Sequence, residues 1–417
     1  MASRARSPLH RVHRAHSGYP SAASLSSVIT GSRALPPRPR AEEGTGGTMA
    51  STARDAPAKP PAPHPACLRW AVNISRWHPS DDHDGPEFRF LLALLPEHER
   101  EECLRFRFMD DKKRALVSRL MQRAACARVA GVPHADVLLR RTKGKKPFFA
   151  WTEMAGFDAA RAGFGAAPNF NFNVSHEGAF VVLASEPVAI VGVDVAAPGQ
   201  LRDRNRRGAA RSVEEIVNAS RDTLSAAETH AILRDDAGAT EAEKEDAFRR
   251  HWSCKEALTK AMGVGLGMEL KRASFAFSRE CSANDARAYD AHVEVDGAPK
   301  PKWRFRVERF RAPATGDPGE RGSRAFPEEP SQARDHWITV ARGPTEDVTD
   351  ALGAFRNTWR APDAGREDDA AWRAVADAPA PPFSVLTVGD LVPSEALDAF
   401  ERAGGEVFGG RRRGSTV

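Results

Sequence analysis

Residues 252–263 read WSCKEALTKAMG, and the other informative segments of the chain lie upstream of this stretch. If this stretch is a helix, five of its residues share one face, because they follow the spacing i, i+3, i+4, i+7 and i+8. They are Trp252, Lys255, Glu256, Thr259 and Lys260. Such a stripe suits the margin of a cleft, where Glu256 ligates a metal or accepts a proton and Lys260 meets developing phosphate charge. The alternative is a solvated Glu–Lys pair, which contributes only about 0.3–0.5 kcal/mol to a helix.

An apolar strand pattern, AIVGVDV at residues 189–195, is interrupted by a single carboxylate, Asp194. An acid inside such a run is costly to bury unless it is paired or bound to a metal. Asp194 is therefore a candidate oxygen ligand for Mg²⁺. A salt bridge or a cap at the end of the strand is the alternative.

A second strand, NFNVSHEG at residues 171–178, ends in polar residues. Ser175 and His176 offer short hydroxyl and imidazole donors of the kind that bind phosphate. The alternative is a strand end whose polar side chains satisfy the turn at Gly178. Taken alone, the segment does not decide between these two interpretations.

A basic loop, RRTKGKKP, occupies residues 140–147. Thr142 and Gly144 separate its cations, which are Arg140, Arg141, Lys143, Lys145 and Lys146. Such a loop suits a phosphate group presented as a dianion. An ordinary exposed basic loop is the alternative.

Strand and helix patterns follow the same order in two halves of the chain. The fold class predicted is α+β, with two similar α/β lobes at residues 67–198 and 199–342. Outside the lobes the sequence predicts a disordered leader at 1–66, a disordered insertion at 343–381, a strand and helix packed back on the body at 382–404, and a disordered tail at 405–417. Residues 88–96 fit either a strand or a short helix.

The positive charge of the chain lies in its N-terminal segment. The 417 residues carry 61 Lys and Arg against 56 Asp and Glu, a net charge of +5. Residues 1–48 hold seven arginines, no lysine and two glutamates, so this segment alone accounts for +5 and the remainder is neutral. A neutral body argues against a nucleic-acid-binding protein. The Arg- and Ser-rich composition predicts a transit peptide, a plain disordered extension, or untranslated sequence upstream of a start at Met49.

Several protein classes are excluded by features that the sequence lacks. No apolar stretch approaches the ~18–20 residues that span a bilayer, because Glu186, Pro187 and Asp194 interrupt the best candidate. Five scattered cysteines without a C-x-x-C pair argue against a disulfide framework and a zinc ribbon. Neither a P-loop nor a glycine-rich dinucleotide loop follows a strand pattern, and the GVGLG at 263–267 follows a helix.

Together the segments carry more information than any one of them. A basic loop, then N-F-N-V-S-H, then G-V-D and then W-x-x-K-E-x-x-x-K resemble, in content and order, the 4′-phosphopantetheinyl transferases. The G-V-D and W-x-x-K-E-x-x-x-K pair defines that superfamily, and the chain is most similar to its surfactin-synthetase-activating type, including the eukaryotic enzymes associated with aminoadipate-semialdehyde dehydrogenase. The resemblance covers about residues 68–342, with a weaker echo at 383–393, and implies two lobes related as a pseudo-dimer.

This resemblance implies a reaction and a set of site residues. The family moves the 4′-phosphopantetheine arm of coenzyme A to a serine of an apo carrier protein and releases 3′,5′-ADP. Asp194 and Glu256 would hold Mg²⁺ on the pyrophosphate of coenzyme A, with Glu177 as a third ligand. Glu256 would also accept the serine proton, and Lys260 would donate to the leaving phosphate.

The same resemblance implies contacts with coenzyme A as the co-substrate. The residues expected to make them are Arg141, Lys145, Lys146, Ser175, His176 and Lys255. A further arginine that relatives use for the 3′-phosphate has no clean equivalent, because the position reads Glu102 and is flanked by Arg100 and Arg105.

The expected partners are coenzyme A and apo acyl or peptidyl carrier domains, with no nucleic acid, no membrane and a monomeric chain. Such an enzyme would serve lysine or fatty acid biosynthesis in the cytoplasm, or in a mitochondrion or plastid if residues 1–48 are a transit peptide. A carrier-facing surface or a solvated loop is expected at Arg202, Arg204, Arg206 and Arg207. The alternatives are a different Mg²⁺-dependent phosphate-transfer enzyme and a catalytically inactive coenzyme A- or carrier-binding scaffold.

Overall fold

A computed structural model describes residues 62–158, 163–199, 211–233, 238–281, 287–311, 335–364 and 369–407. Three segments discussed above lie outside these residues: nearly all of the predicted leader, the arginine cluster and the tail from residue 408. Residues 312–334, whose composition predicts a surface insertion, also lie outside them. Among the described helices, none is long and apolar enough to cross a membrane.

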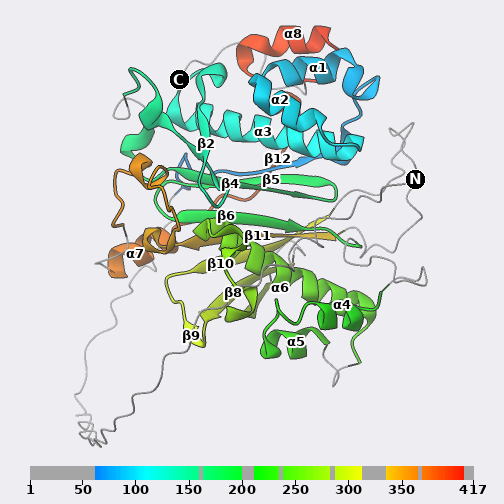
Figure 1. Ribbon diagram of the computed structural model, residues 1–417, viewed down its shortest axis with the longest axis vertical. Coiled ribbons are helices and arrows are strands. Elements are labelled where there is room, and N and C mark those ends of the chain that lie inside the picture. Colours follow the sequence, from blue (N-terminus) through cyan, green and yellow to red (C-terminus); the bar gives the residue numbers. More distant parts are fainter. Residues whose placement is uncertain are drawn as a thin grey trace, which may run out of the picture. The chain divides into compact units, whose positions relative to one another are not determined.

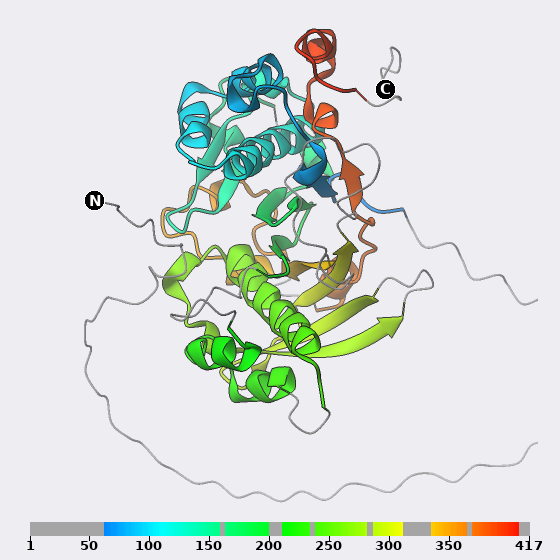
Figure 2. The same cartoon turned by 90° about the vertical axis from the view of Figure 1, so that its right-hand side faces the viewer.

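The first lobe is a mostly antiparallel sheet covered by helices. Its elements are β1 (Arg69–Asn73), α1 (Pro86–Ala93), α2 (Glu97–Leu104), α3 (Met109–Ala130), β2 (Leu139–Arg141), β3 (Pro147–Phe149), β4 (Asn171–Glu177) and β5 (Phe180–Glu186). The strand order is β12-β1-β5-β4, and β2 and β3 form a separate hairpin. β12 (Ser384–Leu386) pairs parallel with β1, so the C-terminal part of the chain returns to the first sheet, as predicted (Figure 2).

The second lobe is a larger antiparallel sheet with its own helices. Its elements are β6 (Ile190–Ala196), α4 (Val213–Ala219), α5 (Ala226–Leu233), α6 (Glu241–Met262), β7 (Ala273–Cys281), β8 (Arg287–Val295), β9 (Ala298–Pro299), β10 (Arg304–Arg311) and β11 (Asp335–Gly343). The strand order is β6-β11-β10-β8-β7, with β9 paired to β8. Two further helices, α7 (Asp369–Ala376) and α8 (Leu397–Arg402), follow in the C-terminal part.

The two lobes share an order of elements, and the predicted fold class is confirmed. In each lobe a first strand is followed by helices, the last of which has 22 residues, and then by antiparallel strands. Both long helices end at a glycine in the left-handed conformation, Gly131 at φ 66° and Gly263 at φ 71°. Glycine adopts this conformation without the steric cost of a Cβ atom, so it stops each helix at a defined residue.

The two sheets pack on each other, with α3 on the outer face of one and α6 on the outer face of the other (Figure 1). Alternate residues of a strand point to opposite faces of its sheet. Accordingly, Val181 and Leu183 of β5 belong to the core under α3, whereas Val182 packs with Val191 and Val193 of β6 between the sheets. β4 is the edge strand of the first sheet and β6 is the edge strand of the second, and these two strands lie near each other.

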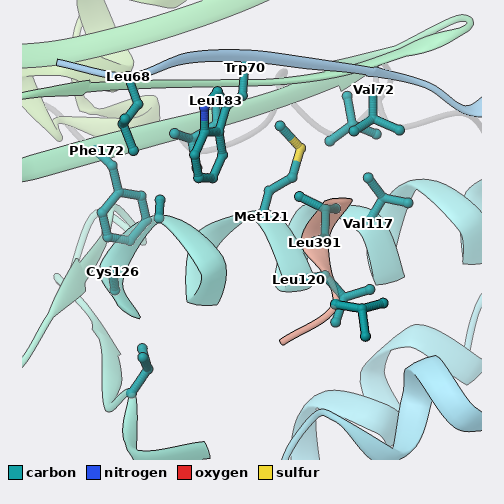
Figure 3. Close-up of a cluster of buried hydrophobic side chains, with 14 of the residues drawn as sticks. Leu68, Trp70, Val72, Val117, Leu120, Met121, Cys126, Phe172, Leu183 and Leu391 are labelled. Atoms are coloured by element: carbon teal, nitrogen blue, oxygen red, sulfur yellow. The ribbon is translucent and has the colours of Figure 1, made fainter. Parts of the chain in front are cut away.

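The core of the first lobe joins segments that are distant in sequence. Figure 3 shows Val117 and Met121 of α3 meeting Trp70 and Leu183 of the sheet, and Leu391 joining them from the C-terminal segment. Burying a side chain of this size stabilises the fold by about 1.5–3 kcal/mol relative to leaving it exposed. The C-terminal segment is thus part of the core.

Two organisational predictions differ from the structure. β6 pairs with β11, so the second lobe begins at Ile190 rather than after residue 198. The insertion predicted to be disordered at 343–381 is ordered over residues 344–364 and from α7 onward. Phe355 and Trp359 from this segment join the core of the second lobe. The apolar area that these two rings bury stabilises the fold of a segment otherwise rich in Pro, Gly and Asp.

Local patterns also left some elements unassigned. Residues 88–96, which fitted a strand or a helix, begin in α1, where Pro86 occupies the start of the helix. Neither α2 nor β3 was predicted. α2 has a strongly charged sequence, EHEREECL, and β3 has only three residues, so neither offers enough periodicity to detect.

Candidate active site

The site begins at the seam where β4 and β6 run beside each other. Side-chain oxygens of Asn171 and Asn173 accept hydrogen bonds from the backbone N–H groups of Val191 and Val193, both at 2.9 Å. These amide side chains take the place of the backbone pairing that a neighbouring strand would supply. The seam therefore aligns the NFNVSHEG strand with the GVDV strand.

Gly192 allows β6 to approach α6 closely. A Cβ atom on Gly192 would lie 2.0 Å from the carbonyl oxygen of Ala257 and 2.5 Å from the amide nitrogen of Ala261. Asp194 is two residues further along the strand, so its side chain points to the same face as Gly192. The glycine of the G-V-D motif thus brings the helix that carries Glu256 and Lys260 against the strand that carries Asp194.

Three side chains from three elements meet at this point. The Lys260 ammonium of α6 donates to Oδ1 of Asp194 at 2.6 Å and to Oγ of Ser175 at 2.8 Å. The Ser175 hydroxyl of β4 in turn donates to Oδ1 of Asp194 at 3.0 Å. The structure therefore brings together the predicted residues Ser175, Asp194 and Lys260.

Two further carboxylates surround this cluster. Burial raises the pKa of Glu256, and the negative charge of Asp194 raises it further. Burial and Asp194 likewise raise the pKa of Glu177 to about 7. Burial works to lower the pKa of Lys260, but Asp194 and Glu256 outweigh it, so the ammonium stays protonated. Three carboxyl groups thus lie around one ammonium, and the raised pKa values of Glu177 and Glu256 reflect both their burial and the cost of ionising the three groups together.

This excess of carboxylate suits a divalent cation. Mg²⁺ typically uses one or two protein carboxylates and takes its other oxygens from phosphate and water, so Asp194 and Glu256 fit it. Among the described residues no group of three or more His, Cys, Asp or Glu is arranged to hold a metal. Glu177 accepts a hydrogen bond from the N–H of Ala197 with one carboxylate oxygen at 2.9 Å, and its role as third ligand stays a prediction.

His176 lies at the exposed end of β4. Surrounding protein atoms lower the pKa of its imidazole to about 4, and the nearby cations Lys260 and Arg114 act in the same direction. The ring is therefore neutral near pH 7 and offers a hydrogen bond rather than a positive charge. Arg114 of α3 donates twice to the carbonyl oxygen of Gly178, at 2.7 and 3.0 Å, and so holds the turn that follows His176.

The basic loop divides into exposed and buried cations. Arg141 and Lys145 are exposed, and Arg141 donates to the carbonyl oxygen of Lys145 at 3.2 Å. Lys146 is 4 % exposed, and its ammonium donates to the carbonyl oxygens of Val191 at 2.7 Å and Lys260 at 3.0 Å. The predicted contact of Lys146 with coenzyme A is therefore replaced by a structural one, in which the loop is tied to β6 and to the last turn of α6.

Lys255 also departs from its predicted role. Its side chain is fully buried, and its ammonium lies 2.8 Å from Glu228 and donates to the carbonyl oxygens of Leu270 and Ala273. These three acceptors use all three N–H groups of the ammonium. No donor is left for a coenzyme A phosphate, so Lys255 stabilises the second lobe instead.

The position that relatives use for the 3′-phosphate is occupied by a paired carboxylate. Glu102 forms an ion pair with Arg119 of α3. Arg100 donates to the carbonyl oxygen of Leu95 at 2.7 Å, and Arg105 lies 3.7 Å from Glu101. Both flanking arginines thus have partners within the chain.

Two residues of the site, Asn171 and Arg114, were not singled out from the sequence. Asn171 and Asn173 form the seam, and Arg114 holds the turn after His176. The alternation N-F-N-F-N over residues 169–173 was an available signal, because amides on the buried face of a strand must find partners. Arg114 offered no local signal, since its acceptor lies 64 residues away.

A lysine and several carboxylates meet at the seam of the two α+β lobes, and such a set of groups suits transfer chemistry on a phosphorylated substrate. Known proteins narrow this class. Residues 75–188 match the model of the N-terminal part of 4′-phosphopantetheinyl transferases, and residues 190–315 match the model of the 4′-phosphopantetheinyl transferase superfamily. The two matches meet at the lobe boundary seen in the structure.

Curated relatives agree with these matches. The chain is 33% identical over 252 residues to a phosphopantetheinyl transferase of Thraustochytrium sp., covering 60% of this chain and 76% of the relative. It is 31% identical over 252 residues to the L-aminoadipate-semialdehyde dehydrogenase-phosphopantetheinyl transferase of Rattus norvegicus, covering 60% of this chain and 72% of the relative. A 4′-phosphopantetheinyl transferase of Paxillus involutus is 26% identical, covering 54% and 78%. The chain belongs to the 4′-phosphopantetheinyl transferase superfamily.

Proposed function

We propose that the cluster of Ser175, Asp194, Glu256 and Lys260 is the active site at which this enzyme transfers 4′-phosphopantetheine. The chain moves this group from coenzyme A to a serine of an apo carrier protein and releases 3′,5′-ADP. The observation that carries the assignment is the contact of Lys260 with both Asp194 and Ser175, which joins the two family signature segments in space. An inactive scaffold has no need to retain this arrangement of charged groups.

The reaction requires a base, a positive charge and an aligned phosphate. The serine oxygen forms a bond to the β-phosphorus of coenzyme A, and the bond from that phosphorus to the bridging oxygen breaks, so that 3′,5′-ADP leaves. Glu256 accepts the serine proton, and its raised pKa makes it a stronger base than an exposed glutamate. The Lys260 ammonium donates to the oxygen on which negative charge develops.

Asp194 and Glu256 are the residues that would hold Mg²⁺. When bound, the ion neutralises charge on the pyrophosphate. Asp194 also orients Lys260 through their 2.6 Å contact. Ser175 fixes the same ammonium from the other strand.

Coenzyme A binding falls to groups on the exposed side of the site. Arg141 and Lys145 are exposed cations suited to a phosphate, and neutral His176 offers an uncharged donor. Arg114 keeps His176 in place by holding the turn at Gly178.

The carrier and the location are further parts of the proposal. Several relatives are named for aminoadipate-semialdehyde dehydrogenase, which favours a carrier domain of that kind and a role in lysine biosynthesis. A fatty acid carrier is the second candidate. We propose a monomer that acts in the cytoplasm, or in a mitochondrion or plastid if residues 1–48 are cleaved.

The test is transfer of a fluorescent coenzyme A conjugate to a panel of purified apo-carriers. We expect a labelled carrier band with added Mg²⁺, no label after chelation, and no label on carriers whose acceptor serine is replaced by alanine. Sequencing the N-terminus of the protein isolated from cells decides between cleavage and a start at Met49. If the purified chain labels no carrier with Mg²⁺ present, the proposed function is wrong.

A further inference from the structure

Three large apolar side chains stand exposed where α2 ends and the chain turns into α3. They are Leu104, Phe106 and Phe108, which are 42%, 45% and 64% exposed. Only two other large apolar side chains of the described residues are exposed, Leu352 and Val385. Single exposed apolar residues are ordinary, but a contiguous group marks an interaction surface.

The residues between these side chains add positive charge. Arg105 and Arg107 alternate with the apolar residues in the sequence LRFRF, and the Arg107 guanidinium lies 5.5 Å from the centre of the Phe108 ring. This stacking keeps the cation at the surface beside the aromatic ring. The Leu104–Phe108 turn is therefore both apolar and basic.

Carboxylates near the turn are already paired within the chain. The ion pairs are Glu101 with Arg105, Glu102 with Arg119, Asp110 with Lys113, and Asp111 with Arg114. Arg107 has a ring contact but no ion pair within the described residues. A partner that meets this turn is favoured if it presents carboxylates around an apolar patch.

The turn also lies next to the active site. It leads directly into α3, whose first turns carry Asp111 and Arg114. Arg114 binds the carbonyl oxygen of Gly178, and the charge of Asp111 acts on the imidazole of His176. A domain seated on the Leu104–Phe108 turn is therefore adjacent to the strand end that carries His176.

We propose that the Leu104–Phe108 turn is the surface on which the acceptor domain docks, through an apolar helix face flanked by carboxylates. The proposal rests on the proposed function, because it requires a macromolecular acceptor that reaches this site. Apolar contact supplies the affinity, and the arginines fix the orientation and increase the rate of encounter. A second copy of this chain is the competing occupant.

The test uses the full chain with Leu104, Phe106 and Phe108 all replaced by serine. We expect KM for the carrier to rise at least tenfold, with kcat at saturating carrier and KM for coenzyme A unchanged. The matched control is a variant with Leu352→Ser and Val385→Ser, which removes apolar side chains elsewhere that are at least as exposed and leaves all three constants unchanged. A second variant, Arg107→Glu, raises KM for the carrier and reverses its dependence on salt.

The outcomes separate docking from the function itself. If the wild-type chain labels a carrier and the triple variant has the same KM, docking on this turn is refuted and the function stands. If the wild-type chain labels no carrier, the function fails, and titration of fluorescent apo-carrier decides docking: binding that the triple variant loses supports it, and equal or absent binding overturns it. A wild-type dimer that the variant converts to a monomer in sedimentation also overturns it.

Discussion

Replacing Gly192 by alanine tests the link between close packing and catalysis. The new Cβ atom would lie 2.0 Å from the carbonyl oxygen of Ala257, whereas an ordinary contact begins at 3.4 Å. Strand and helix must therefore separate by about 1.4 Å, because the opposing atoms belong to the backbone and have no rotamer to change. We expect overpacking to cost about 1–3 kcal/mol, which lowers the melting temperature by roughly 2–12 °C.

The same displacement reaches the active site. Added to the 2.6 Å between Lys260 and Asp194, a separation of about 1.4 Å takes the pair beyond hydrogen-bond distance. Their Coulomb attraction falls by about a third, since it varies inversely with distance. A misplacement of this order costs roughly 100-fold in rate.

The assay is carrier labelling at saturating coenzyme A, together with thermal unfolding. Gly165→Ala is the matched control, because a Cβ atom there meets nothing within 4 Å. We expect Gly165→Ala to keep the wild-type kcat and melting temperature, while Gly192→Ala loses at least tenfold in kcat. If Gly192→Ala behaves like the control in both measurements, the close-packing explanation for the G-V-D glycine is wrong.

Three further predictions concern lysines with different surroundings. Lys260→Ala should lower kcat by roughly 100- to 1,000-fold with a much smaller change in coenzyme A affinity by calorimetry, and unchanged turnover would remove its catalytic role. Lys255→Met should destabilise the fold by about 3–5 kcal/mol in denaturant unfolding, because buried Glu228 keeps the backbone donors of Ser225 and Phe275 but loses the lysine that balances its charge; recovery should follow a second substitution, Glu228→Gln. Burial lowers the pKa of Lys146 from 10.5 to about 7. Between about pH 7 and 10.5 this lysine is therefore protonated in the unfolded chain but not in the folded one. Stability should therefore rise with pH across that window and be constant below it, and Lys146→Met should abolish this slope.

Sequence patterns located the strand and the helix of the candidate site, although each segment alone had an ordinary structural alternative and only their order indicated a function. The strand at 189–195 and the helix ending at Met262 are continuous apolar or amphipathic runs, and Gly263 stops the helix as expected. The order of these segments also pointed to the superfamily that the comparisons support. By contrast, the composition of residues 343–381 was misleading, since a few buried aromatic residues are enough to order a polar segment.

The charge of a residue carried no information about its burial. Lys255 and Lys146 belong to motifs that suggest phosphate contacts, yet both ammonium groups are enclosed by carbonyl or carboxylate oxygens. Arg141 and Lys145, from the same basic loop as Lys146, remain exposed. Alternation of exposed and buried residues within a loop depends on what packs against it, which here is the end of α6.

Periodicity and residue type, which act over a few neighbours, were enough to predict the two-lobed fold class and the helix and strands of the candidate site. The order of the motifs, through the resemblance to a family, singled out Asp194, Glu256 and Lys260. The three-dimensional structure was needed to show that Lys260 meets Ser175 and Asp194, that Gly192 permits this contact, and that Lys255 and Lys146 hold the fold together. These contacts join residues 15 to 114 positions apart or depend on atoms that fill the space between helix and strand, and no local pattern encodes them.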